Sequence, residues 1–185
     1  LNTLMWSHAI PLNTAKLAID KLAMKEKFLA ESIPIPWFVE VKSPQDLNMF
    51  IDKMKPPLII KPVDSRGARG VQLIKSESVN NDLLFNNALQ HSPSKSVILE
   101  RFLAGPQLST ESLVVNTVSH TIGFSDRNYE FIDKFHPFVI ENGGSLPSHL
   151  NNTILEKVDK LLQKSAEALN ITNGVIKGDI VIHKE

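Results

Sequence analysis

The pattern that most constrains this chain is a series of short strand-like runs, some of which follow each other directly while others are separated by helical segments. The runs are rich in β-branched or aromatic residues, and they cover residues 36–41, 58–63, 70–75, 96–102, 108–115, 121–126 and 174–183. Adjacent strands with interspersed helices predict an α+β or mixed α/β protein rather than a doubly wound nucleotide-binding fold.

The sequence predicts four helices, over about residues 14–31, 43–54, 78–90 and 153–169. In the second of them, Ser43 is the expected N-cap and Pro44 occupies the first helical position. A capping box of Thr153 with Glu156 is expected to begin the last helix. The first helix is expected to run without a break until the prolines that follow it.

Composition excludes several classes of protein. The 185 residues carry 20 basic and 20 acidic side chains, so a general nucleic-acid-binding face is not expected. No run approaches about 18 uninterrupted apolar residues, and we expect no membrane partner. The absence of cysteine excludes disulfides and thiolate metal sites, and it fits a reducing, cytoplasmic location. The chain begins with Leu1 rather than methionine, and we expect it to be a fragment of a longer protein.

The stretch "PLIIKPVDSRGARGV", residues 57–71, places a cation at the end of an apolar strand. A lone buried ammonium is costly, so Lys61 should meet an anion or reach water. Gly67 and Gly70 allow backbone N–H groups to approach a ligand closely, and the two neighbouring arginines add charged donors. These features suit a chain of phosphates. The alternative is a β-hairpin with a solvated basic tip and a lysine that extends to water.

Four segments in order resemble the ATP-grasp superfamily, which includes biotin carboxylase, the large subunit of carbamoyl-phosphate synthetase and D-alanine–D-alanine ligase. They are "DKLAMKEKFLAESIPIP" (20–36), the stretch at 57–71, "VILERFLAGPQLSTESLV" (97–114) and "GDIVI" (178–182). The resemblance implies an α+β ATP-grasp fold in which two α+β subdomains hold the nucleotide between them. It also implies the boundaries: residues 1–36 form the first helix of the core subdomain, residues 37–100 the lid, and residues 101–185 the rest of the core, incomplete at its C-terminal end.

The same resemblance implies roles for individual residues. Lys21 and Lys61 correspond to the two phosphate-binding lysines, Glu100 accepts a hydrogen bond from the adenine amino group, and Asp179 is the first magnesium ligand. The backbone of Arg101 and Leu103 reads the adenine edge, with Phe102 supporting the hinge. The implied ligands are ATP and Mg2+, and the implied nucleotide-binding residues are Lys21, Lys61, Ser65, Arg66, Gly67, Ala68, Arg69, Gly70, Glu100, Arg101, Phe102, Leu103, Gln107 and Glu111.

Two departures from the family pattern stand out. Gln107 occupies a position where several members carry a ribose-binding glutamate, and the nearby Glu111 is a candidate substitute. The family's Glu-x-Asn strand, which completes the metal site, would lie beyond Glu185. Asp179 alone is half a site, since magnesium bridging phosphates normally has more than one such ligand. We therefore expect these 185 residues alone to lack ligase activity.

The region that faces the phosphoryl acceptor in the family corresponds to residues 124–150. Arg127 is the candidate catalytic residue there, because a guanidinium binds a carboxylate or phosphate through two parallel hydrogen bonds. The alternative is an ordinary ion pair of Arg127 with Asp126 or Glu130. The loop histidines are expected to be solvated, and the "NGG" at 142–144 to form a turn, with its backbone a candidate part of the acceptor site.

The resemblance implies an ATP-dependent ligase that joins a small-molecule carboxylate to an amine or a thiol through an acylphosphate. Lys61 and Arg127 would stabilise the charge on the transferred phosphoryl group. One alternative is a bicarbonate-activating carboxylase or a carbamoyl-phosphate synthetase-like enzyme, and another is a non-catalytic nucleotide-binding module. The full-length protein is also a candidate homodimer.

Overall fold

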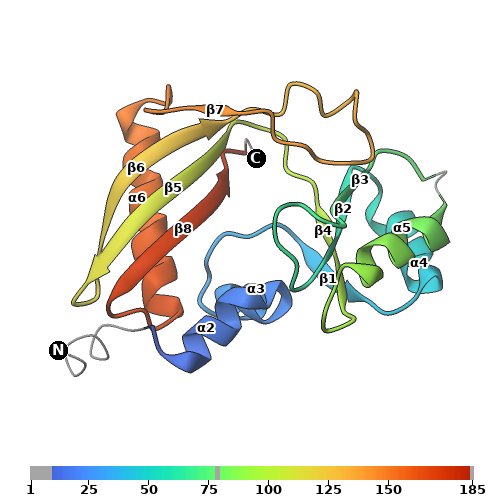
Figure 1. The fold of residues 1–185 in the computed structure, drawn as a ribbon, viewed down its shortest axis with the longest axis horizontal. Coiled ribbons are helices and arrows are strands. Elements are labelled where there is room, and N and C mark those ends of the chain that lie inside the picture. Colours follow the sequence, from blue (N-terminus) through green and yellow to red (C-terminus); the bar gives the residue numbers. More distant parts are fainter. Residues whose placement is uncertain (1–9, 78–79, 184–185) are drawn as a thin grey trace.

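The computed structural model describes residues 10–77 and 80–183, and it confirms the α+β class (Figure 1). The helices are α2 (Leu12–Ile19), α3 (Lys21–Ala30), α4 (Pro44–Met54), α5 (Asn81–Gln90) and α6 (Asn152–Ala168). The strands are β1 (Phe38–Val41), β2 (Leu58–Pro62), β3 (Gln72–Ile74), β4 (Val97–Arg101), β5 (Gln107–Val115), β6 (Val118–Arg127), β7 (Gly144–Ser145) and β8 (Gly174–Val181). No helix in the described part is both long and apolar enough to cross a membrane.

Strands β1–β4 form one antiparallel sheet in the order β1-β4-β2-β3, called here the first sheet. Helices α4 and α5 pack on one of its faces (Figure 1), where Leu47, Ile51, Ile60 and Leu99 belong to one buried hydrophobic core. Successive strand residues point to opposite faces. Lys61, next to Ile60 in β2, therefore points away from α4 and α5.

The second sheet has the order β7-β6-β5-β8, and α6 packs along one of its faces (Figure 1). Alternate residues of β5, such as Leu108 and Thr110, are buried on the α6 side. Ser109 and Glu111 lie on the opposite face, where the strand register pairs them with Asp179 and Lys177 of β8. This second face therefore carries the charged side chains and is the one that a site can use.

The prediction of one continuous helix over residues 14–31 is wrong, because the structure has two helices, α2 and α3, in this part of the chain. Asp20 has an extended backbone (φ −93°, ψ 104°), and its carboxylate accepts hydrogen bonds from the backbone N–H groups of Leu22 and Ala23. Because the side chain of Asp20 caps α3, its backbone is extended, and α2 cannot continue through this residue. The break gives α3 its own start at Lys21.

Helix ends also differ from expectation elsewhere. The capping box at Thr153 is wrong, because Asn151 is the N-cap of α6 and its side chain accepts from the backbone N–H of Ile154. The N-cap expected at Ser43 is confirmed. The helix expected over residues 78–90 is also confirmed, and in the structure it begins at Asn81. Positions 78 and 79 lie outside the described residues.

The sequence predicted a turn at residues 142–144, and in the structure strand β7 begins at the last of these residues, Gly144. Gly144 and Ser145 pair with Arg127 and Asp126 of β6. The absence of a side chain permits this approach, since a Cβ on Gly144 would lie 2.2 Å from the backbone oxygen of Asp126. The composition predicted a turn here and did not indicate that Gly144 pairs with β6.

Candidate functional site

A buried carboxylate lies where the first sheet meets α3. Glu100 of β4 is 5% exposed, and its Oε1 atom lies 2.8 Å from Nζ of Lys61 and 3.4 Å from Nζ of Lys25. Strand β2 carries Lys61 and pairs with β4 so that Ile59 stands opposite Glu100. Lys61 and Glu100 are thus diagonal neighbours on the face turned away from α4 and α5.

Both ammonium groups contact the same oxygen, so the negative charge of the buried Glu100 is compensated within the protein. A carboxylate has two oxygens with about four lone-pair sites, and it can accept further hydrogen bonds beside these two ion pairs. Glu100 can therefore also accept from an amino group such as that of adenine.

Lys21 stands one turn before Lys25, at the first position of α3. Its Nζ donates to the backbone oxygens of Val63 (3.1 Å) and Ser65 (2.7 Å), which begin the glycine-containing loop. Burial lowers the pKa of the Lys21 ammonium below its ordinary value, and the nearby charge of Lys61 lowers it further. The two lysines therefore sit close enough to repel each other, which an anion between them would relieve.

The loop after β2 has the backbone freedom that the sequence suggested. Gly67, Ala68 and Gly70 all have positive φ values (63°, 55° and 73°). Gly70 has a second reason to be glycine, since a Cβ there would lie 2.8 Å from Cγ of Pro62. Arg69 donates from Nε to the backbone oxygen of Arg66, and both arginines are exposed.

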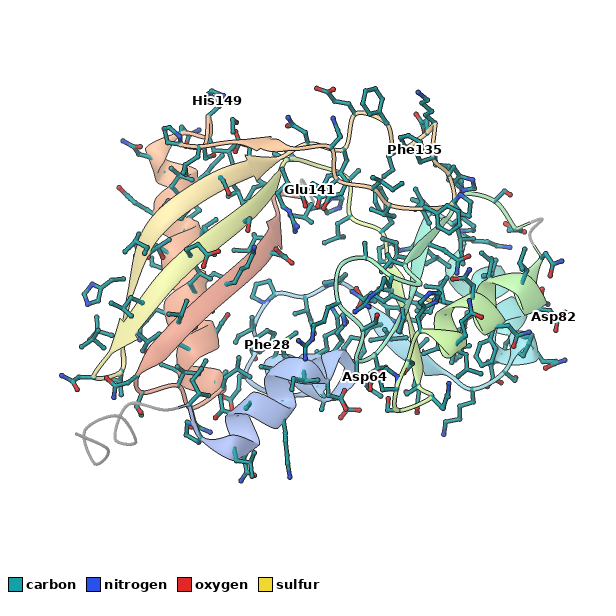
Figure 2. All side chains as sticks on the ribbon, in the orientation of Figure 1. Phe28, Asp64, Asp82, Phe135, Glu141 and His149 are labelled. Atoms are coloured by element: carbon teal, nitrogen blue, oxygen red, sulfur yellow. The ribbon has the colours of Figure 1, made fainter. Side chains whose placement is uncertain are left out.

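The base of this loop is fixed by Asp64, which lies near the start of α3 (Figure 2). Its carboxylate accepts hydrogen bonds from Oγ of Ser92 (2.6 Å) and the backbone N–H of Ser94 (2.9 Å). Partial burial alone would raise the pKa of Asp64, but these hydrogen bonds outweigh it and lower the pKa. The loop is thus anchored at one end and open at its tip.

Two cavities lie beside each other. The first, of about 320 Å³, is lined by Lys21, Pro62, Ser65, Arg66, Gly67, Ala68, Arg69, Val71 and Asp179. The second, of about 430 Å³, is lined by Ser109, Ser125, Asp126, Arg127, Glu141, Gly144, Ser145, Leu146 and Lys177. The loop and Asp179, far apart in sequence, therefore border one space.

Arg127 connects the two cavities. Its Nη1 donates to Oδ1 of Asp179 at 2.8 Å, and its Nε and Nη2 donate to Oε2 of Glu141 at 2.9 and 2.5 Å. Burial lowers the pKa of Arg127, but the hydrogen bonds to Glu141 and the charge of Asp179 outweigh it and raise the pKa. The alternative interpretation, an ion pair of Arg127 with Asp126 or Glu130, names the wrong partners, because Arg127 pairs with Glu141 and Asp179. Asp126 instead accepts from Oγ of Ser148 and from the backbone N–H of His149.

The remaining predicted residues occupy varied positions. The backbone N–H of Arg101 donates to Trp37 and that of Phe102 to Pro57, so neither N–H is free for a ligand. Gln107 lies in β5 between Arg127 and Val181, while Glu111 stands 3.8 Å from Lys177 in an ion pair. The side chain of His149 is exposed and points outward (Figure 2).

Sequence reasoning missed three charged residues near the site. Lys25 follows Lys21 by four residues and so faces the same side of α3, and Lys177 precedes Asp179 by two and so shares its sheet face. Both signals were present in the sequence. Glu141, labelled in Figure 2, had none, because a loop fixes its approach to Arg127.

Asp179 is the only predicted metal ligand in the chain, and its side chain is 65% exposed. Within residues 10–77 and 80–183, no three histidine, aspartate or glutamate side chains are grouped so that they could hold a metal ion. Mg2+ at this site would therefore need other oxygen ligands, and phosphate oxygens are suitable ones. The described residues fit a metal that arrives with a nucleotide.

A segment between β6 and β7, residues 128–143, reaches from the second sheet to the first (Figure 1). The backbone N–H of Leu73 donates to the oxygen of Pro137 at 2.7 Å, and an isolated bridge joins Gln72 to Phe138. Asp133 also forms an ion pair with Lys75 of the first sheet. The segment thus spans the space between the sheets on one side.

Comparison with known proteins agrees with this geometry. A family model described as "ATP-grasp domain" matches residues 18–185. A D-alanine–D-alanine ligase of Synechococcus sp. (strain JA-3-3Ab) is 35% identical over 105 residues, covering 56% of this chain and 31% of the ligase. Another, of Gloeobacter violaceus, is 26% identical over 183 residues, covering 94% of this chain and 57% of the ligase. The chain therefore spans only part of the relatives it matches.

Solved structures support the same fold. An L-amino acid ligase from Bacillus licheniformis superposes with a TM-score of 0.75 at 19% identity, covering 95% of this chain and 40% of that one. VanG D-Ala:D-Ser ligase from Enterococcus faecalis gives 0.76 at 17% identity, covering 92% of this chain and 50% of that one. At such identities the likeness concerns the fold alone.

Proposed function

The chain belongs to the ATP-grasp family, and from this premise we propose that it is the ATP- and Mg2+-binding part of a ligase that joins a carboxylate to an amine through an acylphosphate. The observation that carries the proposal is the convergence of Lys21, the loop of residues 65–70 and Asp179 on one cavity. Lys21, Arg66 and Arg69 supply three cations, the loop supplies backbone N–H groups and Asp179 supplies a carboxylate, and these are the groups that a Mg2+-bound polyphosphate requires.

The two sheets would act as the two parts of the grip. We assign the lid to residues 37–100 and the core to residues 1–36 and 101–185. Lys21 and Lys61 would bind phosphate oxygens, and the buried carboxylate of Glu100 would accept a hydrogen bond from the adenine amino group. ATP supplies the phosphoryl group that activates the carboxylate, while the lysines hold the phosphates in position.

The second cavity would receive the acceptor. Arg127 and Lys177 are the cations in its lining, and in the structure Arg127 is paired with Glu141 and Asp179, so a substrate carboxylate would replace one of these partners. A substrate carboxylate placed against these cations would lie near the phosphate end of the first cavity. Proximity of this kind is the main contribution that a protein makes to phosphoryl transfer. A thiol in place of the amine, a homodimeric full-length protein and a cytoplasmic location stay predictions of the sequence.

Two measurements test the proposal. Titration calorimetry of the 185-residue chain with ATP and Mg2+ should show one binding event that ADP competes for. The full-length protein should then release ADP only when a small carboxylate and an amine are both present. Absence of ATP binding by both proteins would contradict the proposal, and ADP release driven by bicarbonate would favour a carboxylase instead.

A further inference from the structure

Lys25 is a buried charge for which the proposed function so far has no role. It lies in the middle of α3, is 8% exposed, and its Nζ atom is 3.4 Å from Oε1 of Glu100. The ammonium also stands over the ring of Phe38, 5.8 Å from the ring centroid. A lysine is almost never this buried unless it is paired, and Glu100 is the carboxylate that pairs with it.

Burial lowers the pKa of the Lys25 ammonium, the charge of Glu100 opposes this effect, and the charge of Lys61 adds to it. The neighbouring Lys21 cannot take over the role of Lys25, because its own Nζ donates to the carbonyls of Val63 and Ser65. Lys25 and Lys61 are therefore the two cations in direct contact with Glu100 in the described structure.

The proposed function places conflicting demands on this cluster. Lys61 must reach the phosphates and Glu100 must accept from adenine, yet in the structure Lys61 and Glu100 contact each other at 2.8 Å. With Lys61 as its only cation, a buried carboxylate would hold that lysine strongly, since an unpaired buried charge is costly. A second cation that stays on Glu100 would remove this cost.

We propose that Lys25 is the positioning residue that holds Glu100 as the acceptor for the adenine amino group and so frees Lys61 for the phosphates. This inference rests on the proposed function. Lys25 is suited to the task because the Asp20 cap fixes the start of α3 and burial leaves the ammonium little freedom to move. Lys61 is more exposed, with 19% of its side chain accessible against 10% for Lys25.

The test compares ATP with inosine triphosphate, which carries a 6-oxo acceptor where adenine has an amino donor. A carboxylate held at the adenine edge binds the first and repels the second, whereas both nucleotides have the same phosphates. A change at the phosphates therefore cancels in the ratio of the two dissociation constants. A change in the orientation of Glu100 remains in that ratio.

Lys25→Met should reduce the preference for ATP over inosine triphosphate by about tenfold or more, the size of a lost hydrogen bond to a charged group. Lys25→Arg should keep most of the preference. Lys27→Met is the matched control, because Lys27 lies on the same helix but forms an exposed ion pair with Glu31. An unchanged ratio in Lys25→Met, with both nucleotides weakened equally, would overturn the inference and leave a purely structural role.

Lys25→Met alone can fail to fold, because it leaves Glu100 with one cation. The Glu100→Gln background removes that carboxylate and keeps the test open. If Lys25 acts through Glu100, adding Lys25→Met to Glu100→Gln should not change the nucleotide ratio further. A further drop of tenfold in the double variant would contradict the inference.

Failure of the proposed function gives a different result. The wild-type chain would then bind neither nucleotide, and the inference would fall with it. A wild type that binds ATP and prefers it, together with a Lys25→Met variant that keeps the preference, overturns the role of Lys25 alone.

Discussion

Nη1 of Arg127, the last residue of β6, donates a hydrogen bond of 2.8 Å to Oδ1 of Asp179 in β8. Strand β5 lies between these two strands in the sheet, so the pair crosses over a central strand. The contact joins the residue proposed for the acceptor to the residue proposed for the metal. Any cation that binds Asp179 must compete with this guanidinium or share the carboxylate with it.

Removing the guanidinium should therefore strengthen metal binding. Arg127→Met is expected to tighten Mn2+ binding to the ATP complex by about two- to fivefold, since exposed ion pairs contribute about 0.2–1 kcal/mol. Electron paramagnetic resonance of free Mn2+ measures this affinity. Asp179→Asn is the control, because in that background Arg127→Met should have no effect. Unchanged Mn2+ affinity in Arg127→Met would argue against Asp179 as the metal ligand.

Lys61→Met and Lys21→Met should each weaken ATP binding by well over tenfold. Each lysine provides a charged hydrogen bond, which contributes about 1.5–3 kcal/mol. Calorimetry gives the affinities, and Lys53→Met, an exposed lysine in the last turn of α4, is the control. Unaltered ATP affinity in both variants would remove the phosphate assignment.

The loop of residues 64–70 should exchange its backbone hydrogens faster than residues 155–169, which cover most of α6 and its C-cap, when no nucleotide is bound. Its tip is exposed and carries two arginines, whereas α6 is hydrogen-bonded throughout. Hydrogen–deuterium exchange with mass spectrometry should show slowing of the loop on addition of ATP and Mg2+. Equal exchange with and without the ligand would count against its role as a lid.

Asp64 should contribute to stability in a pH-dependent way. Its pKa in the folded protein is lowered from 3.8 because hydrogen bonds from Ser92 and Ser94 outweigh burial. A carboxylate with a lowered folded pKa adds stability above its unfolded pKa and loses it as pH falls through the folded value. Asp64→Asn should thus be destabilised by about 1–3 kcal/mol at pH 7, and less at pH 2.

Urea unfolding between pH 2 and pH 7 measures this effect. Asp52→Asn is the control, because Asp52 is exposed on α4 and accepts only a long, exposed hydrogen bond from Asn48. A stability difference between Asp64→Asn and wild type that stays constant over the whole range would contradict the predicted linkage.

Asp20→Ala should destabilise the protein by about 0.5–2 kcal/mol, the usual cost of losing an N-cap. Its carboxylate satisfies the first free N–H groups of α3, which positions Lys21 and Lys25. Thermal unfolding followed by circular dichroism measures the loss. Asp20→Asn should restore most of it, since asparagine also caps, and an equal loss in both variants would indicate a role other than capping.

The sequence by itself determined the α+β class, most strand positions and the nature of the loop after β2. These depend on local properties: apolar alternation, cap residues, and glycines with positive φ. A local property also marked Lys61, because a cation that ends an apolar strand needs a partner, whereas Lys21 and Asp179 became candidates only through the resemblance to the ATP-grasp superfamily. The cap at Asp20 is also a local feature of the sequence. The helical pattern of residues on both sides of it nevertheless predicted one continuous helix instead of α2 and α3.

Only the tertiary structure decided which charges meet. Arg127 is 52 residues from Asp179 along the chain and 14 from Glu141, so strand order and a loop, rather than spacing, brought them together. Glu100 of β4 likewise meets Lys25 of α3, which is 75 residues away in the sequence, only through the tertiary arrangement. Charge pairing acts over a few ångströms, and such distances between remote segments depend on how the sheets pack.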